Sequence, residues 1–146
     1  MATNEDASCL FCAILKVQKR AAAPAFFNTS SSFAFLDIMP AADGHTQVIP
    51  KYHAETLGDL PDEYLRDIGP VIKKIALATG VAEYNVLQNN GKMAFQHVPH
   101  VHFHVVPKPN ASEGLVITPE VTFTQKKATN EELAATCARM IQKVRL

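Results

Sequence analysis

The sequence predicts an α+β domain built on an antiparallel sheet of about five strands, with one main helix and a second helix near the C-terminus. Three observations lead to this fold class. Short segments rich in β-branched and aromatic residues recur along the chain, separated by turn residues. One long segment with helical spacing lies between them, and another follows them all. Because strands and helices do not alternate regularly, we expect an antiparallel sheet and not a doubly wound parallel one.

Five segments carry the strand pattern. A serine-rich turn separates the first two, which are therefore expected to form a hairpin. The third follows the Asp43-Gly44 turn and ends at Pro50. The expected strands lie at 25–28, 32–38, 45–51, 83–91 and in the histidine-rich stretch that follows Gln96.

The main helix is expected over residues 61–80. Pro61 suits its first position, apolar residues recur at helical spacing, and Gly80 offers a C-terminal stop. The Gly69-Pro70 pair argues against one continuous helix, because an interior proline kinks or splits it.

The C-terminal helix is predicted by its start signal. Residues 129–132 (TNEE) fit a capping box, and apolar residues then recur on one helical face. Cys137 falls on that face and is expected to be a small buried apolar residue.

Length and charge limit the class of protein. The chain has 146 residues, which suits a single domain over 1–146 with a real core. Fourteen basic residues balance fourteen acidic ones without a basic run, so no nucleic-acid partner is expected. No apolar run reaches membrane-spanning length, and Glu5 and Asp6 lie where a signal peptide is positively charged. We therefore expect no membrane partner and a cytoplasmic location, with the nucleus as a second compartment.

Four of the six histidines lie in the stretch QHVPHVHFHVVPKP, which begins at Gln96. On a strand, His100, His102 and His104 would share one face, and the apolar residues between them would be buried on the other. A solvated polar face is the plainest explanation, but so tight a cluster of an uncommon residue argues against it.

Two chemical explanations remain for these histidines. Imidazoles suit zinc, copper or iron, yet His100 and His104 would lie roughly 13 Å apart along a strand and need a bend to share one ion. Nucleophilic catalysis uses all three residues, because a neutral imidazole is a competent nucleophile whose neighbours can fix its tautomer. The sequence favours the second explanation.

The cysteines form a separate motif. Cys9 and Cys12 have the CxxC spacing of half a tetrahedral zinc site, which needs two further ligands. The alternative is that CLFC simply opens a short amphipathic helix and packs in the core. The odd total of three cysteines argues against a disulfide framework.

Four blocks of the sequence together resemble the histidine triad (HIT) family of nucleotide hydrolases and transferases. HVHFHVV matches the His-φ-His-φ-His-φ-φ signature, and NNGKMAFQHVPHVHFHVVPKP extends the match towards the N-terminus. FAFLDIMPAADGHTQVIPKYH and CLFCAI resemble further blocks of the family, in the family's order. The resemblance covers most of residues 9–108 and implies a HIT-like fold there, with 109–146 as a C-terminal extension.

The resemblance implies roles for particular residues. His102 takes the position of the histidine that attacks the α-phosphate and forms a nucleotidyl-histidine intermediate. His104 would bind phosphate or lie near the leaving group, and His100 would flank the nucleophile as the third catalytic histidine. Asp37 matches a carboxylate that binds the ribose hydroxyls, and His45 is expected to orient its neighbours. The implied nucleotide-binding residues are Asp37, Ile38, Asn89, Phe95, Gln96, His97 and His104.

His97 departs from the better-known members, which carry serine there in the animal Hint branch and threonine in the Fhit branch. Imidazole is bulkier than either hydroxyl, so the substitution bears on the choice of leaving group and not on the class of reaction.

The resemblance also implies a cofactor and a partner. Members with this cysteine motif complete a zinc site with two histidines, which correspond to His53 and His100 beside Cys9 and Cys12. The zinc would be structural, and the chemistry would need no cofactor. Many members are homodimers that join their sheets.

Three functions follow from these expectations. The first is a Hint-branch hydrolase that cleaves purine nucleoside 5′-phosphoramidates, such as AMP-NH2 or AMP-lysine, to AMP. The others are a Fhit-like hydrolase of diadenosine polyphosphates and a non-enzymatic nucleotide- or zinc-binding scaffold. The uridylyltransferase branch is disfavoured, because its motif carries glutamine where this chain has His104.

Overall fold

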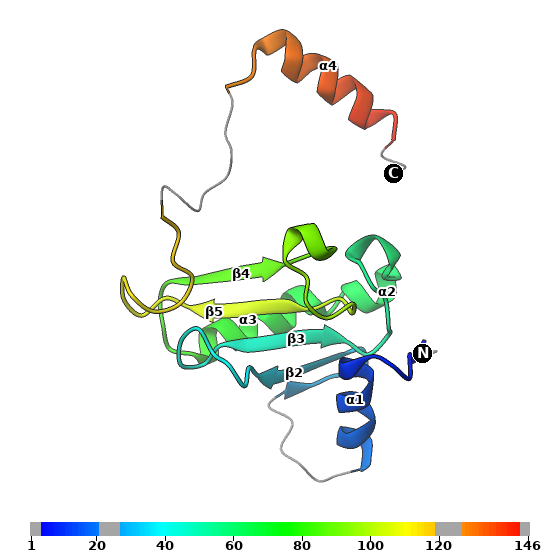
Figure 1. The fold of residues 1–146 in the computed structure, drawn as a ribbon, viewed down its shortest axis with the longest axis vertical. Helices are drawn as coiled ribbons and strands as arrows, with labels where there is room; N and C mark the ends of the chain where they lie inside the picture. Colours follow the sequence, from blue (N-terminus) through cyan, green and yellow to red (C-terminus); the bar gives the residue numbers. More distant parts are fainter. Residues whose placement is uncertain (1–3, 21–26, 119–126, 144–146) are drawn as a thin grey trace. The chain divides into compact units, whose positions relative to one another are not determined.

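The computed structural model describes residues 4–20, 27–118 and 127–143. The chain divides into two compact units, one up to Val116 and the other from Ile117 onwards. The elements in chain order (Figure 1) are α1 (Leu10–Arg20), β1 (Phe27–Asn28), β2 (Ser32–Leu36), β3 (Thr46–Pro50), η1 (Leu57–Asp59), α2 (Asp62–Leu65), α3 (Ile68–Ala78), β4 (Tyr84–Gln88), η2 (Lys92–Ala94), β5 (Phe103–Pro107) and α4 (Asn130–Ile141).

A five-stranded antiparallel sheet forms the centre of the first unit, as the sequence predicts. The strand order is β1-β2-β3-β5-β4, and every neighbouring pair is antiparallel. The histidine strand is shorter than expected, because β5 begins only at Phe103. His104 is therefore the one triad histidine inside the strand, whereas His100 and His102 lie in the irregular segment before it. That segment still runs beside the residues that follow β3, since the Val101 amide donates to the Ala54 carbonyl over 2.8 Å.

The expected helix over 61–80 is divided into α2 and α3. Pro61 is the cap residue before α2 and not its first helical residue. Pro70 lies in the first turn of α3, where its missing N–H removes no helical hydrogen bond. Gly80 follows the C-cap with a φ of 70°, as expected of a helix stop.

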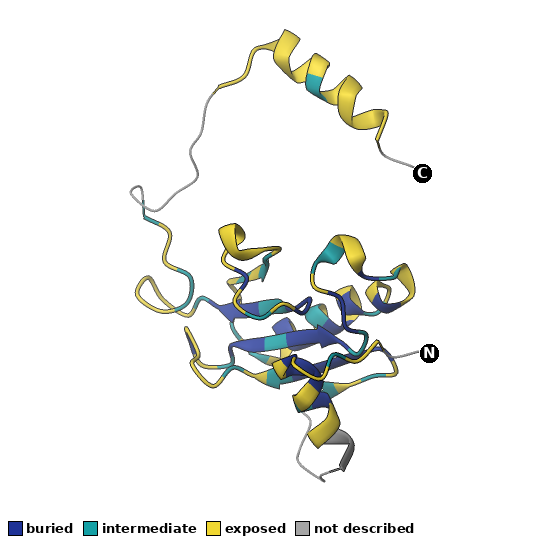
Figure 2. Cartoon of the chain, turned by 45° about the vertical axis from the view of Figure 1, so that its right-hand side comes forward, coloured by how far each residue is buried: buried dark blue, intermediate teal, exposed yellow. Residues whose placement is uncertain are grey.

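Each face of the sheet packs against a helix, and a hydrophobic core lies between the sheet and each of these two helices. Helix α3 lies along one face (Figure 1), where it packs on alternate residues of β2, β3 and β5. Helix α1 covers part of the opposite face, the one to which His104 belongs; the buried residues of both cores appear dark blue in Figure 2. The α3 core contains Ala34, Val48, Val71, Ile75, Ala76 and Val105, and the α1 core contains Cys9, Phe11, Cys12, Leu15, Phe33 and Ile49.

The second unit contains α4, which confirms the predicted C-terminal helix. The Thr129 hydroxyl accepts from the Glu132 amide, and the Glu132 carboxylate accepts from the Thr129 amide, so the capping box is complete. Cys137 is exposed, contrary to expectation, because α4 buries none of its residues against the other described residues of its unit.

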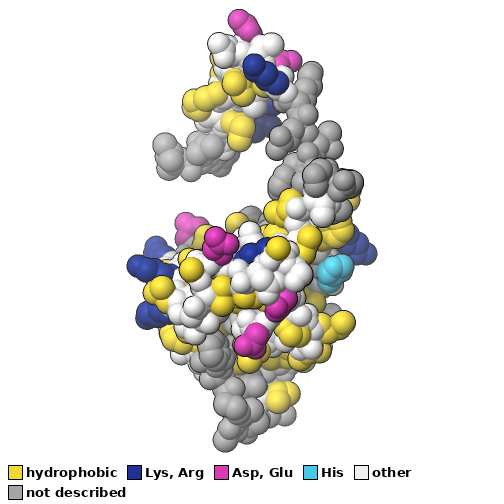
Figure 3. Space-filling model, turned by 90° about the vertical axis from the view of Figure 1, so that its left-hand side faces the viewer, with side chains coloured by type: hydrophobic (Ala, Val, Ile, Leu, Met, Phe, Trp, Pro, Cys, Tyr) yellow, Lys and Arg dark blue, Asp and Glu magenta, His cyan; other side chains and the backbone are white. Residues whose placement is uncertain are grey.

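Two surface properties bear on possible partners. In the described residues, no helix is long and apolar enough to cross a membrane. On the face drawn in Figure 3, basic and acidic side chains are scattered among apolar and neutral ones.

Candidate active site and metal cluster

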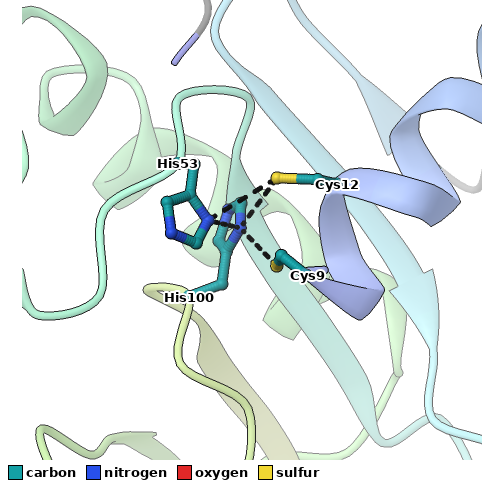
Figure 4. A group of neighbouring side chains, drawn as sticks. All are labelled: Cys9, Cys12, His53 and His100. Atoms are coloured by element: carbon teal, nitrogen blue, oxygen red, sulfur yellow. Dashed lines mark hydrogen bonds between the residues drawn. The ribbon is translucent and has the colours of Figure 1, made fainter. Parts of the chain in front are cut away.

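Cys9, Cys12, His53 and His100 converge on one point between the start of α1 and the segments that follow β3 and precede β5 (Figure 4). All four side chains are buried. The Nδ1 atoms of the two histidines are 3.3 Å apart, and three sulfur–nitrogen distances are 3.4, 3.5 and 3.8 Å. The four side chains thus present two sulfur and two nitrogen atoms to a common centre.

The spacing of these atoms fits a tetrahedral zinc ion. Bond lengths of about 2.0–2.1 Å to nitrogen and 2.3 Å to sulfur place tetrahedral ligands about 3.3 Å apart for two nitrogens. The same geometry gives about 3.6 Å between nitrogen and sulfur. The observed distances agree with both values.

Hydrogen bonds turn the correct nitrogen of each histidine towards this centre. His100 Nε2 donates to the Pro50 carbonyl over 2.9 Å, so its Nδ1 carries a lone pair. Burial lowers the pKa of His100 to about 4, which keeps that nitrogen unprotonated at neutral pH. His53 Nε2 lies 3.8 Å from the Asp6 carboxylate, which favours a proton there and a lone pair on Nδ1. Two nitrogen lone pairs at 3.3 Å repel unless a cation or a proton lies between them.

His102 is buried, and only one of its two ring nitrogens has a hydrogen-bond partner among the described residues. Its Nδ1 lies 2.7 Å from the His100 carbonyl, and because a carbonyl only accepts, Nδ1 carries the proton. Nε2 is therefore the atom with the free lone pair. The ring packs edge-on against Phe11 with centroids 5.2 Å apart, and burial lowers its pKa. The result is a neutral imidazole held with one basic nitrogen free.

His104 has the opposite tautomer. The Ala41 amide donates to His45 Nδ1 over 3.1 Å, so the proton of neutral His45 is on Nε2. That Nε2 lies 2.9 Å from His104 Nδ1 and donates to it, which leaves the His104 proton on Nε2. Burial lowers the pKa of His104 to about 4, with further lowering from His102 and His45. A lone pair on His102 and an N–H on His104 thus lie on adjacent rings, whose centroids are 5.0 Å apart.

Asp37 is held beside this pair as a charged group. Its carboxylate accepts from the Met39 amide over 2.8 Å and from Gln47 Nε2 over 2.6 Å, and it lies 3.7 Å from His45 Nε2. Burial alone raises the pKa of Asp37, but these hydrogen bonds and the histidines lower it below the usual value. Ile38, the next residue, is almost fully exposed.

The loop between β4 and β5 is shaped by Gln96. The buried Gln96 side chain accepts from the Gly91 amide and donates to the Glu55 carbonyl, each over 2.6 Å. Both ends of its amide are therefore engaged in closing the loop. Phe95 is exposed and has a left-handed φ of 61°, and its carbonyl accepts from Asn89 over 3.4 Å.

A cavity of about 320 Å³ opens beside His104. It brings together four of the expected nucleotide-binding residues, whereas Asp37, Ile38 and Gln96 do not line it. Its lining consists of Ala41, His45, Leu87, Asn89, Phe95, His97, His104, Val106, Gly114, Leu115 and Val116.

The burial of His102 and His104 as neutral rings predicts that the stability of the folded chain depends on pH. Because the pKa of His104 falls to about 4 and that of His102 is also lowered, the unfolded chain binds more protons than the folded one below about pH 6.5. The stabilisation from burying both as neutral rings is complete above about pH 6.5 and is lost as pH falls towards 4. We expect thermal melts to show constant stability from pH 7 to 8 and a progressive loss below 6. Constant stability down to pH 4 would contradict neutral, buried rings.

Comparison with known proteins identifies the family. The HIT domain family matches residues 18–111. The chain is 46% identical over 135 residues to adenosine 5'-monophosphoramidase HNT1 of Saccharomyces cerevisiae, covering 89% of this chain and 83% of that protein. It is 46% identical over 131 residues to hnt1 of Schizosaccharomyces pombe, also named adenosine 5'-monophosphoramidase, covering 88% and 97%. The chain belongs to the HIT family.

Solved structures place it in the HIT fold as well. A hypothetical protein from Leishmania major matches with a TM-score of 0.81 and 39% identity, covering 94% of this chain and 99% of that one. A histidine triad nucleotide-binding protein from Candida albicans matches with a TM-score of 0.80 and 36% identity, covering 93% and 96%. The predicted fold class is thereby confirmed.

Two parts of this HIT site were not evident from the sequence. Gln47 belongs to no motif in the sequence, although it follows His45 by two residues at the start of an expected strand, where side chains two apart share a face. The segment 114–116 belongs to the poorly matched C-terminal extension, so nothing in the sequence indicated that it lines a cavity with β4 and β5.

Proposed function

We propose that this chain is a nucleoside phosphoramidase that cleaves the P–N bond of purine nucleoside 5′-phosphoramidates and releases AMP. One observation carries the proposal: His102 presents a lone pair and His104 an N–H on adjacent rings. A nucleophile next to a hydrogen-bond donor is what displacement at phosphorus requires. The two yeast relatives named adenosine 5'-monophosphoramidase support the choice of substrate.

The reaction proceeds in two displacements. His102 Nε2 attacks the α-phosphorus, the N–P bond to the enzyme forms, and the bond to the leaving amine breaks as that nitrogen takes a proton from solvent. The positive charge that develops on His102 is stabilised through Nδ1–H by the His100 carbonyl. Water then attacks phosphorus, loses a proton to solvent, and returns the electron pair to His102 Nε2. His104 acts as a donor to the phosphoryl oxygens and not as an acid, because a neutral imidazole would have to become an anion.

The remaining residues bind the nucleotide in this proposal. The Asp37 carboxylate faces the ribose hydroxyls, with Ile38 beside the base. Asn89, His97 and the backbone at Phe95 contact the phosphate, and Gln96 holds their loop in shape.

A release assay tests the proposal against the two alternatives. Adenosine 5′-phosphoramidate and diadenosine polyphosphates are each incubated with the full chain, and AMP is measured. We expect kcat/KM for the phosphoramidate to exceed that for the diadenosine compounds at least about tenfold. The reverse order would establish a Fhit-like hydrolase, and no AMP from either would favour a scaffold.

Zinc is the metal that best fits the cysteine–histidine cluster. Cys9, Cys12, His53 and His100 would hold it, and four protein ligands leave no open position for substrate, so its contribution would be structural. His100 would join the two sites, since its ring nitrogen faces the Cys9 sulfur and its carbonyl accepts from His102. The metal cluster would therefore position the nucleophile without taking part in the reaction.

We also propose a homodimer that pairs β4 with its copy. Strand β4 is an edge strand of the sheet, and Tyr84 and Val86 on it are both 44% exposed. We expect sedimentation to give twice the 16.0 kDa of one chain, and Val86→Lys to shift it towards monomer. A monomeric wild-type protein would exclude this assembly.

A further inference from the structure

Residues 4–8 hold the backbone of two members of the metal cluster. The Asn4 carbonyl accepts from the His53 amide, and Asn4 Nδ2 donates to the His53 carbonyl, each over 3.1 Å. The Asp6 carbonyl accepts from the Cys9 amide over 3.3 Å. Cys9 and His53 come from distant parts of the chain, so this short segment connects a sulfur and a nitrogen of the cluster.

The two oxygens of the Asp6 carboxylate have different partners. Oδ1 accepts from the amide and from the hydroxyl of Ser8, each over 2.7 Å, which forms an Asx-turn before α1. Oδ2 lies 3.8 Å from His53 Nε2. Because the turn holds Oδ1, the orientation of the carboxylate is fixed and Oδ2 is directed at the His53 ring.

The His53 ring binds a metal only if its proton is on the nitrogen that faces Asp6. A neutral imidazole has one ring proton, and His53 Nδ1 lies in the cluster, 3.5 Å from Cys12 Sγ. A carboxylate attracts an N–H and repels a lone pair, so Asp6 favours the proton on Nε2. Among the described residues, no other group forms a hydrogen bond or an ion pair with His53 Nε2. Asp6 thus does for His53 what the Pro50 carbonyl does for His100.

We infer that Asp6 is a positioning residue that sets the metal affinity of the cluster by directing the His53 proton to Nε2. This role rests on the proposed zinc site and adds to it a residue outside the four ligands. Asp6 acts through the His53 ring, since its own carboxylate oxygens face Ser8 and His53. A carboxylate behind a histidine ligand typically contributes about 10- to 100-fold in metal affinity.

Asp6→Asn separates the carboxylate from the turn. The asparagine carbonyl can accept from the Ser8 amide as Oδ1 does, and its NH2 group then faces His53 Nε2. An N–H there favours a lone pair on Nε2, which places the His53 proton on Nδ1, where it blocks the metal. With the amide reversed, the NH2 group meets the Ser8 amide and the turn loses its acceptor. In either orientation the variant loses one of the two interactions that Asp6 makes.

The zinc affinity of the full chain is the direct test. Dissociation constants are measured by competition with a chromophoric chelator for the wild-type chain and three variants. Asp6→Asn should weaken zinc binding about 10- to 100-fold. Glu5→Gln removes a charge from the neighbouring residue, which pairs with Lys16, and Ser8→Ala removes only the hydroxyl from the turn. Both should retain the wild-type constant. An unchanged constant in Asp6→Asn, or an equal loss in either control, would overturn the role of Asp6.

The thermal midpoint distinguishes this role from a purely structural one. In the chain with intact cysteines, Asp6→Asn should lower the midpoint, because a more weakly bound metal stabilises the fold less. In the variant with both Cys9→Ser and Cys12→Ser, which lacks the two sulfur ligands, Asp6→Asn should leave the midpoint unchanged. An equal fall in both backgrounds would show that Asp6 only supports the turn.

The zinc content of the wild-type chain separates the failure of this role from the failure of the zinc site. If the wild-type chain binds zinc and Asp6→Asn binds it equally well, only the role of Asp6 fails. If the wild-type chain binds no zinc, the proposed site fails, and the role of Asp6 fails with it.

Discussion

Replacing His102 with alanine is expected to lower kcat/KM for adenosine 5′-phosphoramidate by at least about 10⁴-fold, as for other enzymes that lose their nucleophile. No other described group places an unprotonated imidazole nitrogen in the same position beside the His104 N–H. Folding should survive, because the ring is neutral and alanine leaves no buried charge behind. Turnover by initial rates and the thermal midpoint are measured on the same preparation.

The covalent intermediate gives this prediction its decisive control. The wild-type chain is mixed with substrate and quenched without acid, because a phosphorus–nitrogen bond to histidine is acid-labile. Intact mass and peptide mapping should then find an AMP adduct on His102 and none in His102→Ala. A folded His102→Ala variant with wild-type turnover would refute the mechanism, and an adduct on His104 would reassign the nucleophile.

Loss of the cysteine pair is expected to have the second-largest effect. The wild-type chain should contain about one zinc per chain by elemental analysis, and Cys9→Ser with Cys12→Ser should contain almost none. The thermal midpoint should fall by at least about 10 °C, since about 3 kcal/mol corresponds to that shift in a domain of this size. kcat should also fall, by about tenfold or more, because His100 would no longer be held where its carbonyl accepts from His102.

Cys137→Ser is the matched control for this experiment. Cys137 is exposed on α4 and is not part of the cluster, so the same substitution should leave zinc content and thermal midpoint unchanged. Wild-type protein without metal, together with a midpoint shift of only a few degrees in the double variant, would show that Cys9 and Cys12 are merely core residues.

The local sequence was sufficient to predict most elements of the fold. Strands β2, β3 and β4 occur where alternating and β-branched segments predict them, and Thr129 begins α4 with the expected capping box. These features depend on residues that are close together in the chain, so they can be predicted from a single sequence. A break in the 61–80 segment was also foreseeable, because Pro70 is tolerated only in the first turn of a helix, and α3 accordingly begins at Ile68.

The candidate site was predicted as a set of residues, whereas its chemistry depends on contacts between distant segments. The HIT motif places His100, His102 and His104 in order, but it cannot specify which nitrogen of each ring carries the proton. The Pro50 carbonyl, the His100 carbonyl and the Ala41 amide decide that, and two of these three belong to the segments around β3. His104 alone lies in β5, because the chain bends before Phe103 and directs His100 towards Cys9 and Cys12.

The sequence by itself therefore determined the family, the fold class and the residue types of both sites. Only the tertiary structure decided the tautomers, the agreement of four side chains with tetrahedral spacing, and the cavity beside His104 that Leu115 and Val116 help to line. The physical reason is the distance along the chain between the residues that interact. Propensity and motif spacing act over a few residues, whereas a proton's position and a cavity's shape are set by atoms up to 91 residues apart in the chain.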